Sequence, residues 1–479
     1  MEKQVEPLQM EKQSGESPPP QGFDIIPAHE EAQLLRRLDM FIVPIIMLLY
    51  LSCFLDRANI GNVKVAGMPK DIHATVEQFS IAVSIFYATY VLSETPWAIM
   101  LKKLTPRYLL TGLAIVWSLV TIFSGFITSI GGLYATRLIL GACEGGLFPG
   151  LNLYLTMVYR REEQAKRVSY LFVCTAIAGA FGGLLAYGLL QMDGISGVAG
   201  WRWVYYIEGC FSVVIAAVVF FGLPNDPANA YFLSEPQKEL MRRRAIQRAG
   251  YMGSDDISFE EIKVALTDPK IYLSGLISFC QDTLLYGFST FLPSIIKGWG
   301  YGTLKTQYYT IPVYVVGGLS FVIMANISDR LRLRGPFLLI ANCFGIIGYV
   351  LLLSPLPVGV HYLATFFCAI AVYTGPGINV TWLNVNIAPH YRRATAIGMQ
   401  QTIGNTAGIV AGQIYRKAPY KLGNGFSLGA ICIGQFLITA QMLHYRYLTR
   451  EKAAISEGRA EDKRKVRTGD RALDFDYHL

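Results

Sequence analysis

Two oppositely charged residues, Arg137 and Glu144, lie inside a long apolar stretch of this chain. They are seven positions apart, so a helix places them on one face, about 10.5 Å apart along its axis. An ionised group in hydrocarbon costs several kcal/mol, so each one needs a function or a partner. We interpret the two residues as stations of one binding site. The alternatives are an arginine that snorkels to the interface and a glutamate bonded to a neighbouring helix.

A second charged pair, Asp56 and Arg57, closes the first apolar stretch of the chain. Taken alone, Asp-Arg at the end of such a helix is most often a plain pair at the membrane interface. The pair begins the motif Asp-Arg-x-Asn-Ile-Gly.

The second half of the chain carries amides and hydroxyls inside its apolar stretches, and Asp282 is its only acid in the middle of one. Gln281, Asn379 and Asn384 are the residues that we expect to bind substrate by hydrogen bonds. Helix–helix bonding is the alternative for each amide. The run from Tyr373 to Gly377 contains Pro376 and predicts a break in its helix.

The composition of the chain indicates that these residues lie in membrane-spanning segments. Of the 479 residues, 52% are hydrophobic and 16% are charged, against about 25% charged in an average soluble protein. The apolar residues gather in stretches of about 18 to 25, the length that spans a bilayer. The chain is therefore predicted to be an integral membrane protein. A soluble enzyme, a secreted disulfide scaffold and a disordered protein are excluded. The eight cysteines are isolated, which predicts neither a disulfide nor a metal site.

We count twelve predicted spans, divided six and six by a polar stretch, so the predicted fold is all-α with two six-helix bundles. The fourth, seventh, tenth and eleventh spans cover 131–158, 270–293, 361–387 and 393–415. The predicted organisation is a disordered N-terminal tail at 1–37, a six-helix bundle at 38–223, a central loop at 224–269, a second bundle at 270–447 and a disordered C-terminal tail at 448–479.

The net charge of +8 is explained by where the basic residues lie. About three quarters of the 42 Lys and Arg residues fall on the side of the membrane that carries both termini in this topology. Cytoplasmic loops are enriched in this way. We therefore predict that both termini are cytoplasmic, and nucleic acid is not an expected partner.

Small residues repeat every four positions in three predicted spans: Gly141 and Gly145, Gly179 and Gly183, and Gly404, Gly408 and Gly412. Such faces let helices approach closely. We predict that they serve either sliding at the interface between the two bundles or plain packing within one bundle.

Three motifs carry a resemblance to a known family. They are Asp56-Arg57-x-Asn59-Ile-Gly61 after the first span, Arg137-x6-Glu144-Gly145 in the fourth, and Gly200-Trp-Arg-Trp-Val-Tyr-Tyr-Ile-Glu208-Gly209 in the sixth. In these motifs the chain resembles the fungal anion:cation symporter branch of the major facilitator superfamily, which includes allantoate, nicotinate and pantothenate permeases. The resemblance covers about residues 35–450.

The resemblance implies roles by position. Arg57 and Arg137 take the places of anion-binding arginines, and Asp56 and Glu144 those of proton-titrating carboxylates. Lys102, Lys103 and Arg107, with Asp329 and Arg330 in the second half, match loop motifs that latch the cytoplasmic face. The first of these loops departs from the family pattern because it lacks an Asp.

The sequence thus predicts a secondary active transporter of a small organic anion, coupled to protons, in the plasma membrane. The proton is the only expected coupling ion, and no other cofactor is predicted. The chain has no Gly-Lys dipeptide, so it contains no P-loop for an ATP-driven pump. We expect a monomer in the lipid bilayer and no enzyme activity. The alternatives are an exporter of an acidic secondary metabolite encoded in a biosynthetic gene cluster, and a nutrient receptor that does not transport.

Overall fold

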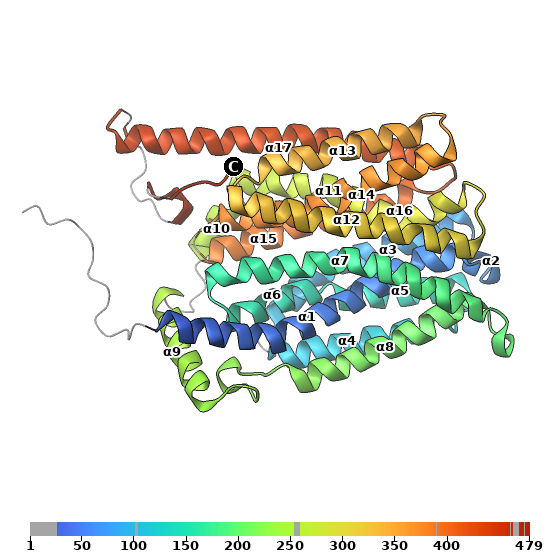
Figure 1. Ribbon diagram of the computed structural model, residues 1–479, viewed down its shortest axis with the longest axis horizontal. Coiled ribbons are helices and arrows are strands. Elements are labelled where there is room, and N and C mark those ends of the chain that lie inside the picture. Colours follow the sequence, from blue (N-terminus) through green and yellow to red (C-terminus); the bar gives the residue numbers. More distant parts are fainter. Residues whose placement is uncertain are drawn as a thin grey trace, which may run out of the picture.

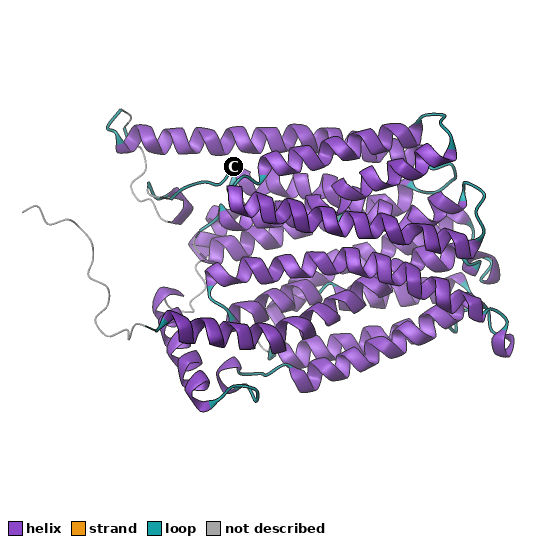
Figure 2. Cartoon of the chain, in the orientation of Figure 1, coloured by secondary structure: helices purple, strands orange, loops and turns teal. Residues whose placement is uncertain are grey.

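The computed structural model describes residues 26–100, 104–252, 259–388, 390–459, 461–462, 469–473 and 475–479. Within these ranges every regular element is a helix (Figure 2). The helices lie roughly parallel to one another, as expected for a protein whose backbone polar groups must be satisfied inside each segment that crosses hydrocarbon.

The long helices form two bundles, seen in Figure 1 as the blue-to-green and the yellow-to-red halves of the ribbon. The N-terminal bundle consists of α1 (Ala28–Val65), α3 (Val76–Met100), α4 (Pro106–Ser124), α5 (Ile130–Glu144), α6 (Leu147–Val158), α7 (Arg161–Leu189) and α8 (Gly200–Gly222), with the short α2 (Met68–Asp71) after α1. The C-terminal bundle consists of α11 (Pro269–Lys297), α12 (Thr303–Leu331), α13 (Gly335–Leu353), α14 (Val358–Val385), α15 (His390–Asn405), α16 (Ala407–Ile414) and α17 (Lys421–Ser456).

Two helices, α9 (Glu235–Met252) and α10 (Phe259–Leu266), connect the bundles. They lie at the end of the molecule where α1 begins and α17 ends, on the left in Figure 1. We call this end the terminal face and the opposite end, where α2 lies, the far face. The predicted central loop is therefore partly helical, and α9 begins directly after Ser234, whose backbone N–H donates to the Gln237 side chain at 3.2 Å.

Ten helices within the described ranges are long and apolar enough to cross a membrane. The two other predicted spans, 270–293 and 393–415, are helical as well. The first is α11, which carries buried polar side chains such as Gln281 and Asp282, and the second is split between α15 and α16. Polar content and a break between helices explain why these two spans fall outside the ten.

The helices differ from the predicted ones at two places. The fourth predicted span is divided, because α5 ends at Glu144 and α6 begins at Leu147 after two glycines. The predicted break around Pro376 is wrong, because α14 runs through it without interruption. The whole run from Tyr373 to Gly377 is buried. Packing on all sides compensates for the hydrogen bond that a proline removes, as it does in other membrane helices.

The predicted disordered N-terminal tail at 1–37 is wrong for its last ten residues, since α1 begins at Ala28. Residues 1–25 lie outside the described residues. Glu30 and Glu31 occupy the first turn of α1, where negative charge interacts favourably with the helix dipole. The Glu31 carboxylate also pairs with Arg244 of α9 at 3.0 Å and with Arg160 at 2.8 Å. These pairs, which come from distant segments, fix the helix start.

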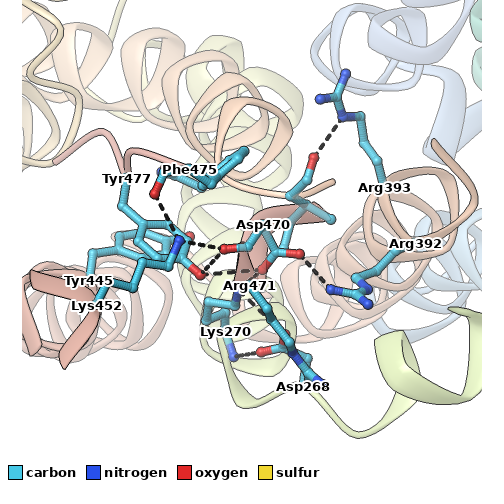
Figure 3. A network of polar contacts seen from close by, with 12 residues as sticks. Asp268, Lys270, Arg392, Arg393, Tyr445, Lys452, Asp470, Arg471, Phe475 and Tyr477 are labelled. Carbon is cyan, nitrogen blue, oxygen red and sulfur yellow. Dashed lines mark hydrogen bonds and ion pairs between the residues drawn. The ribbon is translucent and has the colours of Figure 1, made fainter. Parts of the chain in front are cut away.

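The predicted disorder of the C-terminal tail at 448–479 is also wrong for the described residues. Helix α17 continues to Ser456, and Asp470 is fully buried against the terminal face (Figure 3). The Asp470 carboxylate forms ion pairs with Lys270 of α11 and, at 2.6 Å, with Arg392 of α15. The Lys452 ammonium donates to the Asp470 backbone carbonyl at 2.8 Å.

The last residues of the chain extend this attachment along the terminal face. The Trp382 indole N–H donates to the carbonyl of His478 at 2.9 Å, and the Arg334 backbone N–H donates to that of Leu479. The Tyr477 hydroxyl donates to the Asp470 carbonyl at 2.6 Å. The tail thus connects the ends of five C-terminal-bundle helices, α11, α13, α14, α15 and α17.

We expect the Asp470→Asn variant to release this tail at neutral pH. Burial alone raises the pKa of the Asp470 carboxyl, but the charges and hydrogen bonds of Lys270 and Arg392 outweigh burial and hold this pKa below its usual value. The stabilisation is therefore complete above about pH 4 and is lost as the pH falls through the lowered pKa. Removing one partner of a buried ion pair costs about 3 to 5 kcal/mol.

The measurement is the rate at which trypsin cleaves the tail of the purified protein. We expect at least tenfold faster cleavage for Asp470→Asn at pH 7. The exposed Asp476 provides the matched control, since Asp476→Asn should leave the rate unchanged. Equal rates for both variants and the wild type would contradict the anchoring role of Asp470.

Glycines allow the two bundles to touch closely toward the far face. Gly408 and Gly412 of α16 lie against Tyr87 and Ser84 of α3, with no space for a Cβ atom. Gly179 and Gly183 of α7 meet α12 across the same interface in the same way. The row Gly179 and Gly183 and two members of the row Gly404, Gly408 and Gly412 therefore lie between the bundles, whereas Gly404 packs against α11 within the C-terminal bundle. The third row, Gly141 and Gly145, packs within the N-terminal bundle against α3.

Replacing Gly408 by Leu should hold the bundles apart at the far face, because the new side chain meets the Tyr87 ring. Overpacking of this kind costs about 1 to 3 kcal/mol, and we expect transport to fall at least tenfold. Gly429 of α17 has open space around it, so Gly429→Leu is the matched control. Transport by Gly408→Leu at the control's rate would show that this contact is dispensable.

Candidate functional site

The centre of the candidate site is an ion pair between Arg57 of α1 and Glu144 at the end of α5. The Arg57 Nε and Nη2 atoms both donate to Glu144 Oε2, at 3.1 and 2.9 Å. The Cys53 thiol, one turn earlier on α1, donates to the same oxygen at 3.0 Å. Arg57 is 7% exposed and Glu144 is 0% exposed. At such a depth, loss of either partner leaves a buried charge uncompensated.

Aromatic rings surround the Arg57 guanidinium group. Its central carbon lies 4.6 Å from the Phe54 ring centroid, 4.8 Å from that of Tyr90 and 5.3 Å from that of Phe86. A guanidinium group is weakly hydrated and interacts favourably with aromatic faces. These contacts let the charged group stay inside the bundle while keeping donors for an anion.

Two further acids lie in the same bundle. Asp56 Oδ2 accepts from the Ser212 hydroxyl at 3.1 Å, and Glu208 Oε2 accepts from the Asn59 amide at 2.7 Å. Asp56 and Glu208 are each 1% exposed. One carboxyl oxygen of each of these acids, and one of Glu144, is buried without a hydrogen-bond partner. A buried oxygen without a partner is a natural place for a proton, because the neutral acid avoids the cost of an unpaired charge.

Arg137, the second predicted arginine, lies deeper in the N-terminal bundle. Its Nη2 atom donates to the Tyr205 hydroxyl at 3.0 Å, and the residue is 3% exposed. It lines neither of the two cavities described next. Glu144, seven positions further along α5, pairs with Arg57 and not with Arg137.

Two narrow neighbouring cavities lie between the bundles, and Arg57 lines both. The first is lined by Phe54, Arg57, Ala58, Thr175, Gly179, Leu285, Tyr286, Ser289, Thr290, Tyr314 and Tyr373. The second is lined by Tyr50, Phe54, Arg57, Tyr90, Phe148, Phe172, Thr175, Ser278, Asp282, Leu285, Tyr286, Pro376, Val380, Gln401 and Asn405. Residues of both bundles thus enclose the space around one guanidinium group, and many of them are aromatic.

Glu94 of α3 links the two bundles beside the second cavity. Its Oε1 atom accepts from the Asn405 amide at 2.7 Å, and its Oε2 atom accepts from the Thr402 hydroxyl at 3.2 Å. Asn405 in turn accepts from the Tyr286 hydroxyl at 2.5 Å. Glu94 is 6% exposed. This chain of bonds crosses the interface that must change if the bundles move relative to each other.

The three amides expected to bind substrate lie inside the C-terminal bundle and line neither cavity. The Asn379 amide donates to the Ser278 hydroxyl at 2.8 Å and to the Ser274 carbonyl at 3.1 Å, which is helix–helix bonding. Gln281 packs against Gly375, and Asn384 has a buried amide oxygen without a partner. Asp282, the neighbour of Gln281 on α11, lines the second cavity.

The predicted latch residues are placed as follows. Lys102 and Lys103 lie outside the described residues. Arg107 lies in the first turn of α4, and its guanidinium carbon is 4.7 Å from the Phe220 ring centroid. Asp329 pairs with Arg334 at 2.8 Å within the C-terminal bundle. Arg330 is exposed.

Several members of the site were not identified from the sequence. Glu208 is predicted only as part of the third family motif, and Glu94 is not among the predicted site residues. The aromatic lining, with Phe148 and Phe172 as examples, gives no sequence signal, because aromatic residues occur throughout the apolar helices. A polar residue inside an apolar stretch is a signal, and it points to both Glu94 and Glu208.

Two helical bundles that enclose charged residues at their interface are typical of membrane transporters. The sequence profile of the Major Facilitator Superfamily matches residues 46–412. The chain belongs to this superfamily and is a membrane transporter. The resemblance found in the sequence motifs is thereby confirmed.

Relatives and solved structures agree with this assignment. An uncharacterized transporter of Schizosaccharomyces pombe is 48% identical over 94% of each chain. The high-affinity nicotinic acid transporter of Saccharomyces cerevisiae is 31% identical over 90% of this chain and 81% of its own. The crystal structure of a D-xylose-proton symporter superposes with a TM-score of 0.65 and 16% identity, covering 84% of this chain and 97% of its own. This last likeness concerns the fold alone.

Proposed function

We propose that this transporter carries a small organic anion, a carboxylate of vitamin or nitrogen-metabolite size, in symport with protons. The observation that supports the proposal most strongly is the position of Arg57, which lines the cavities between the bundles while its partner Glu144 is fully buried. A guanidinium group binds carboxylates by charge-assisted hydrogen bonds, often two at once.

Coupling to protons follows from competition for Arg57. A substrate carboxylate that binds Arg57 displaces Glu144, which then becomes a buried charge without a partner. Uptake of a proton by Glu144 removes that cost. Anion binding and proton binding therefore favour each other, and such coupling is reciprocal.

The charge balance of the N-terminal bundle supports the same proposal. Near the site, Arg57 and Arg137 are two buried positive charges of this bundle, and its four buried acids are Asp56, Glu94, Glu144 and Glu208. With all six ionised, this cluster would repel an anion. Protons on these acids remove the repulsion. Arg137 thus contributes as a second fixed positive charge, and Asp56 and Glu144 remain the proposed proton carriers.

The aromatic lining favours a flat substrate. Phe54 and Tyr90 present rings to the Arg57 guanidinium group, and Tyr286 lines the same cavity. Planar groups stack well on such rings. The relative from Saccharomyces cerevisiae is described as a transporter of nicotinic acid, a carboxylate on a flat ring. We propose a substrate of this class for the present chain.

Alternating access accounts for the arrangement of the bundles. The close contacts at Gly408 and Gly179 lie toward the far face, so these contacts must part when the site opens there. We propose that the terminal face is cytoplasmic, that the protein acts as a monomer and that it resides in the plasma membrane. An epitope tag on either terminus that antibodies reach in intact cells would contradict the orientation.

The test uses purified protein in liposomes with labelled nicotinate as the first probe and a panel of other carboxylates beside it. An acidic exterior should drive accumulation of a carboxylate above its equilibrium level, and a protonophore should abolish it. Labelled xylose serves as the uncharged control and should not accumulate. Uptake of no carboxylate, or accumulation that ignores the pH gradient, would contradict the proposal. A substrate loaded inside should leave when the gradient is reversed, since a coupled carrier follows its gradients.

A further inference from the structure

Asp282 of α11 differs from every other buried acid around the cavities. It is 6% exposed and lines the second cavity. No hydrogen bond or ion pair joins its carboxyl group to another described residue. Both of its carboxyl oxygens keep some accessible surface. By contrast, Asp56, Glu94 and Glu144 all have side-chain partners.

Asp282 and Arg57 face the same cavity from opposite bundles. Arg57 comes from α1 and Asp282 from α11, and both line the second cavity together with Tyr90 and Tyr286. They do not pair with each other, because the partner of Arg57 is Glu144. A buried polar group normally has a hydrogen-bond partner. The carboxyl group of Asp282 is therefore free to form a hydrogen bond with a ligand in the cavity.

Protein packing keeps this carboxyl group in place. Gly404 of α15 lies against the Asp282 carboxylate, so even a Cβ atom at that position would collide with it. The close approach fixes the side chain on one side and leaves the cavity as its open side. A side chain held in this way is positioned to bind a ligand, whereas a side chain with only a packing role would contact protein on all sides.

We propose that Asp282 determines specificity by binding a nitrogen group at the end of the substrate opposite to its carboxylate. This inference rests on the proposed function, in which Arg57 holds the carboxylate. The substrate class is a flat carboxylic acid that bears a ring nitrogen or an N–H group on its far side. With a pyridine-type ring nitrogen, one proton taken up from the solvent lies between the Asp282 oxygen and that nitrogen, and the pair carries no net charge. With a neutral N–H group, the ionised Asp282 carboxylate accepts the hydrogen bond.

The experiment compares two probes that differ by one ring atom, benzoate and pyridine-3-carboxylate. Binding of each to the purified full-length protein is measured for the wild type, Asp282→Ala and Asp282→Asn. The wild type should prefer the nitrogen-bearing probe at least tenfold, because an unpaired buried polar group penalises the analogue that lacks the nitrogen. Asp282→Ala should reduce this preference to within about twofold while still binding benzoate.

Asp282→Asn keeps the shape of the side chain and serves if the alanine variant does not fold. It should bind the two probes with a preference clearly below that of the wild type. Glu77 lies exposed in the first turn of α3, so Glu77→Ala is the matched control and should keep the wild-type preference. An unchanged preference in both Asp282 variants, or an equal loss of both probes, would overturn this inference. Failure of the wild type to bind either probe would count against the proposed anion transport as well.

Discussion

Replacing Arg57 by Gln is expected to lower uptake of the transported anion by about tenfold to hundredfold. A hydrogen bond to a charged group contributes about 1.5 to 3 kcal/mol, and each 1.4 kcal/mol corresponds to a factor of ten. The variant keeps a polar side chain of similar reach but removes the positive charge that attracts the carboxylate. Uptake into liposomes measures the effect.

The design must separate loss of binding from loss of folding, because Arg57→Gln leaves Glu144 buried without its partner. The double variant Arg57→Gln/Glu144→Gln restores a neutral pair and should recover the melting temperature but not uptake. Arg37 lies exposed on the same helix, so Arg37→Gln is the matched control. Wild-type uptake by Arg57→Gln would remove Arg57 from the proposed site.

Replacing Glu144 by Gln should separate transport from its driving force. The amide cannot take up a proton, so the substrate still exchanges across the membrane but no longer accumulates in response to a pH gradient. Each pH unit contributes about 1.4 kcal/mol per transported proton, or a tenfold concentration ratio. The variant should therefore lose about that factor per unit. Counterflow exchange and net accumulation are measured in the same liposomes.

The control for this experiment is Glu77→Gln, which removes an exposed carboxylate that lines neither cavity. It should accumulate substrate like the wild type. Accumulation against a gradient that survives in Glu144→Gln would assign proton coupling to another acid, with Asp56 and Glu208 as the next variants to make.

The helices of this transporter could be predicted because each one is a local property. A stretch of about 20 apolar residues is long enough to span hydrocarbon, and this holds whatever the stretch packs against. The predicted helix break was wrong because packing between helices outweighed the local preference of the residues. Pro376 signals a break in an isolated helix, yet α14 continues through it because the surrounding helices bury the whole run.

Both tails illustrate the same limit. The residues after 448 show no apolar periodicity, which is typical of a disordered segment. Their attachment depends on one buried carboxylate, Asp470, whose partners Lys270 and Arg392 are 200 and 78 positions away. Periodicity cannot detect a contact of that kind. The start of α1 depends similarly on the pairing of Glu31 with Arg244, 213 positions along the chain.

The sequence by itself determined which charged groups are kept in the membrane, since an ionisable residue inside an apolar stretch can be read directly from the chain. Only the tertiary structure decided the partners of those groups. Arg57 pairs with Glu144, 87 positions away, whereas Arg137 donates a hydrogen bond to Tyr205 on another helix. It also decided that Asp282 rather than Gln281 faces the cavity. Helical spacing ranks the residues of one helix relative to each other, but the rotation of that helix toward its neighbours depends on the packing of the whole bundle.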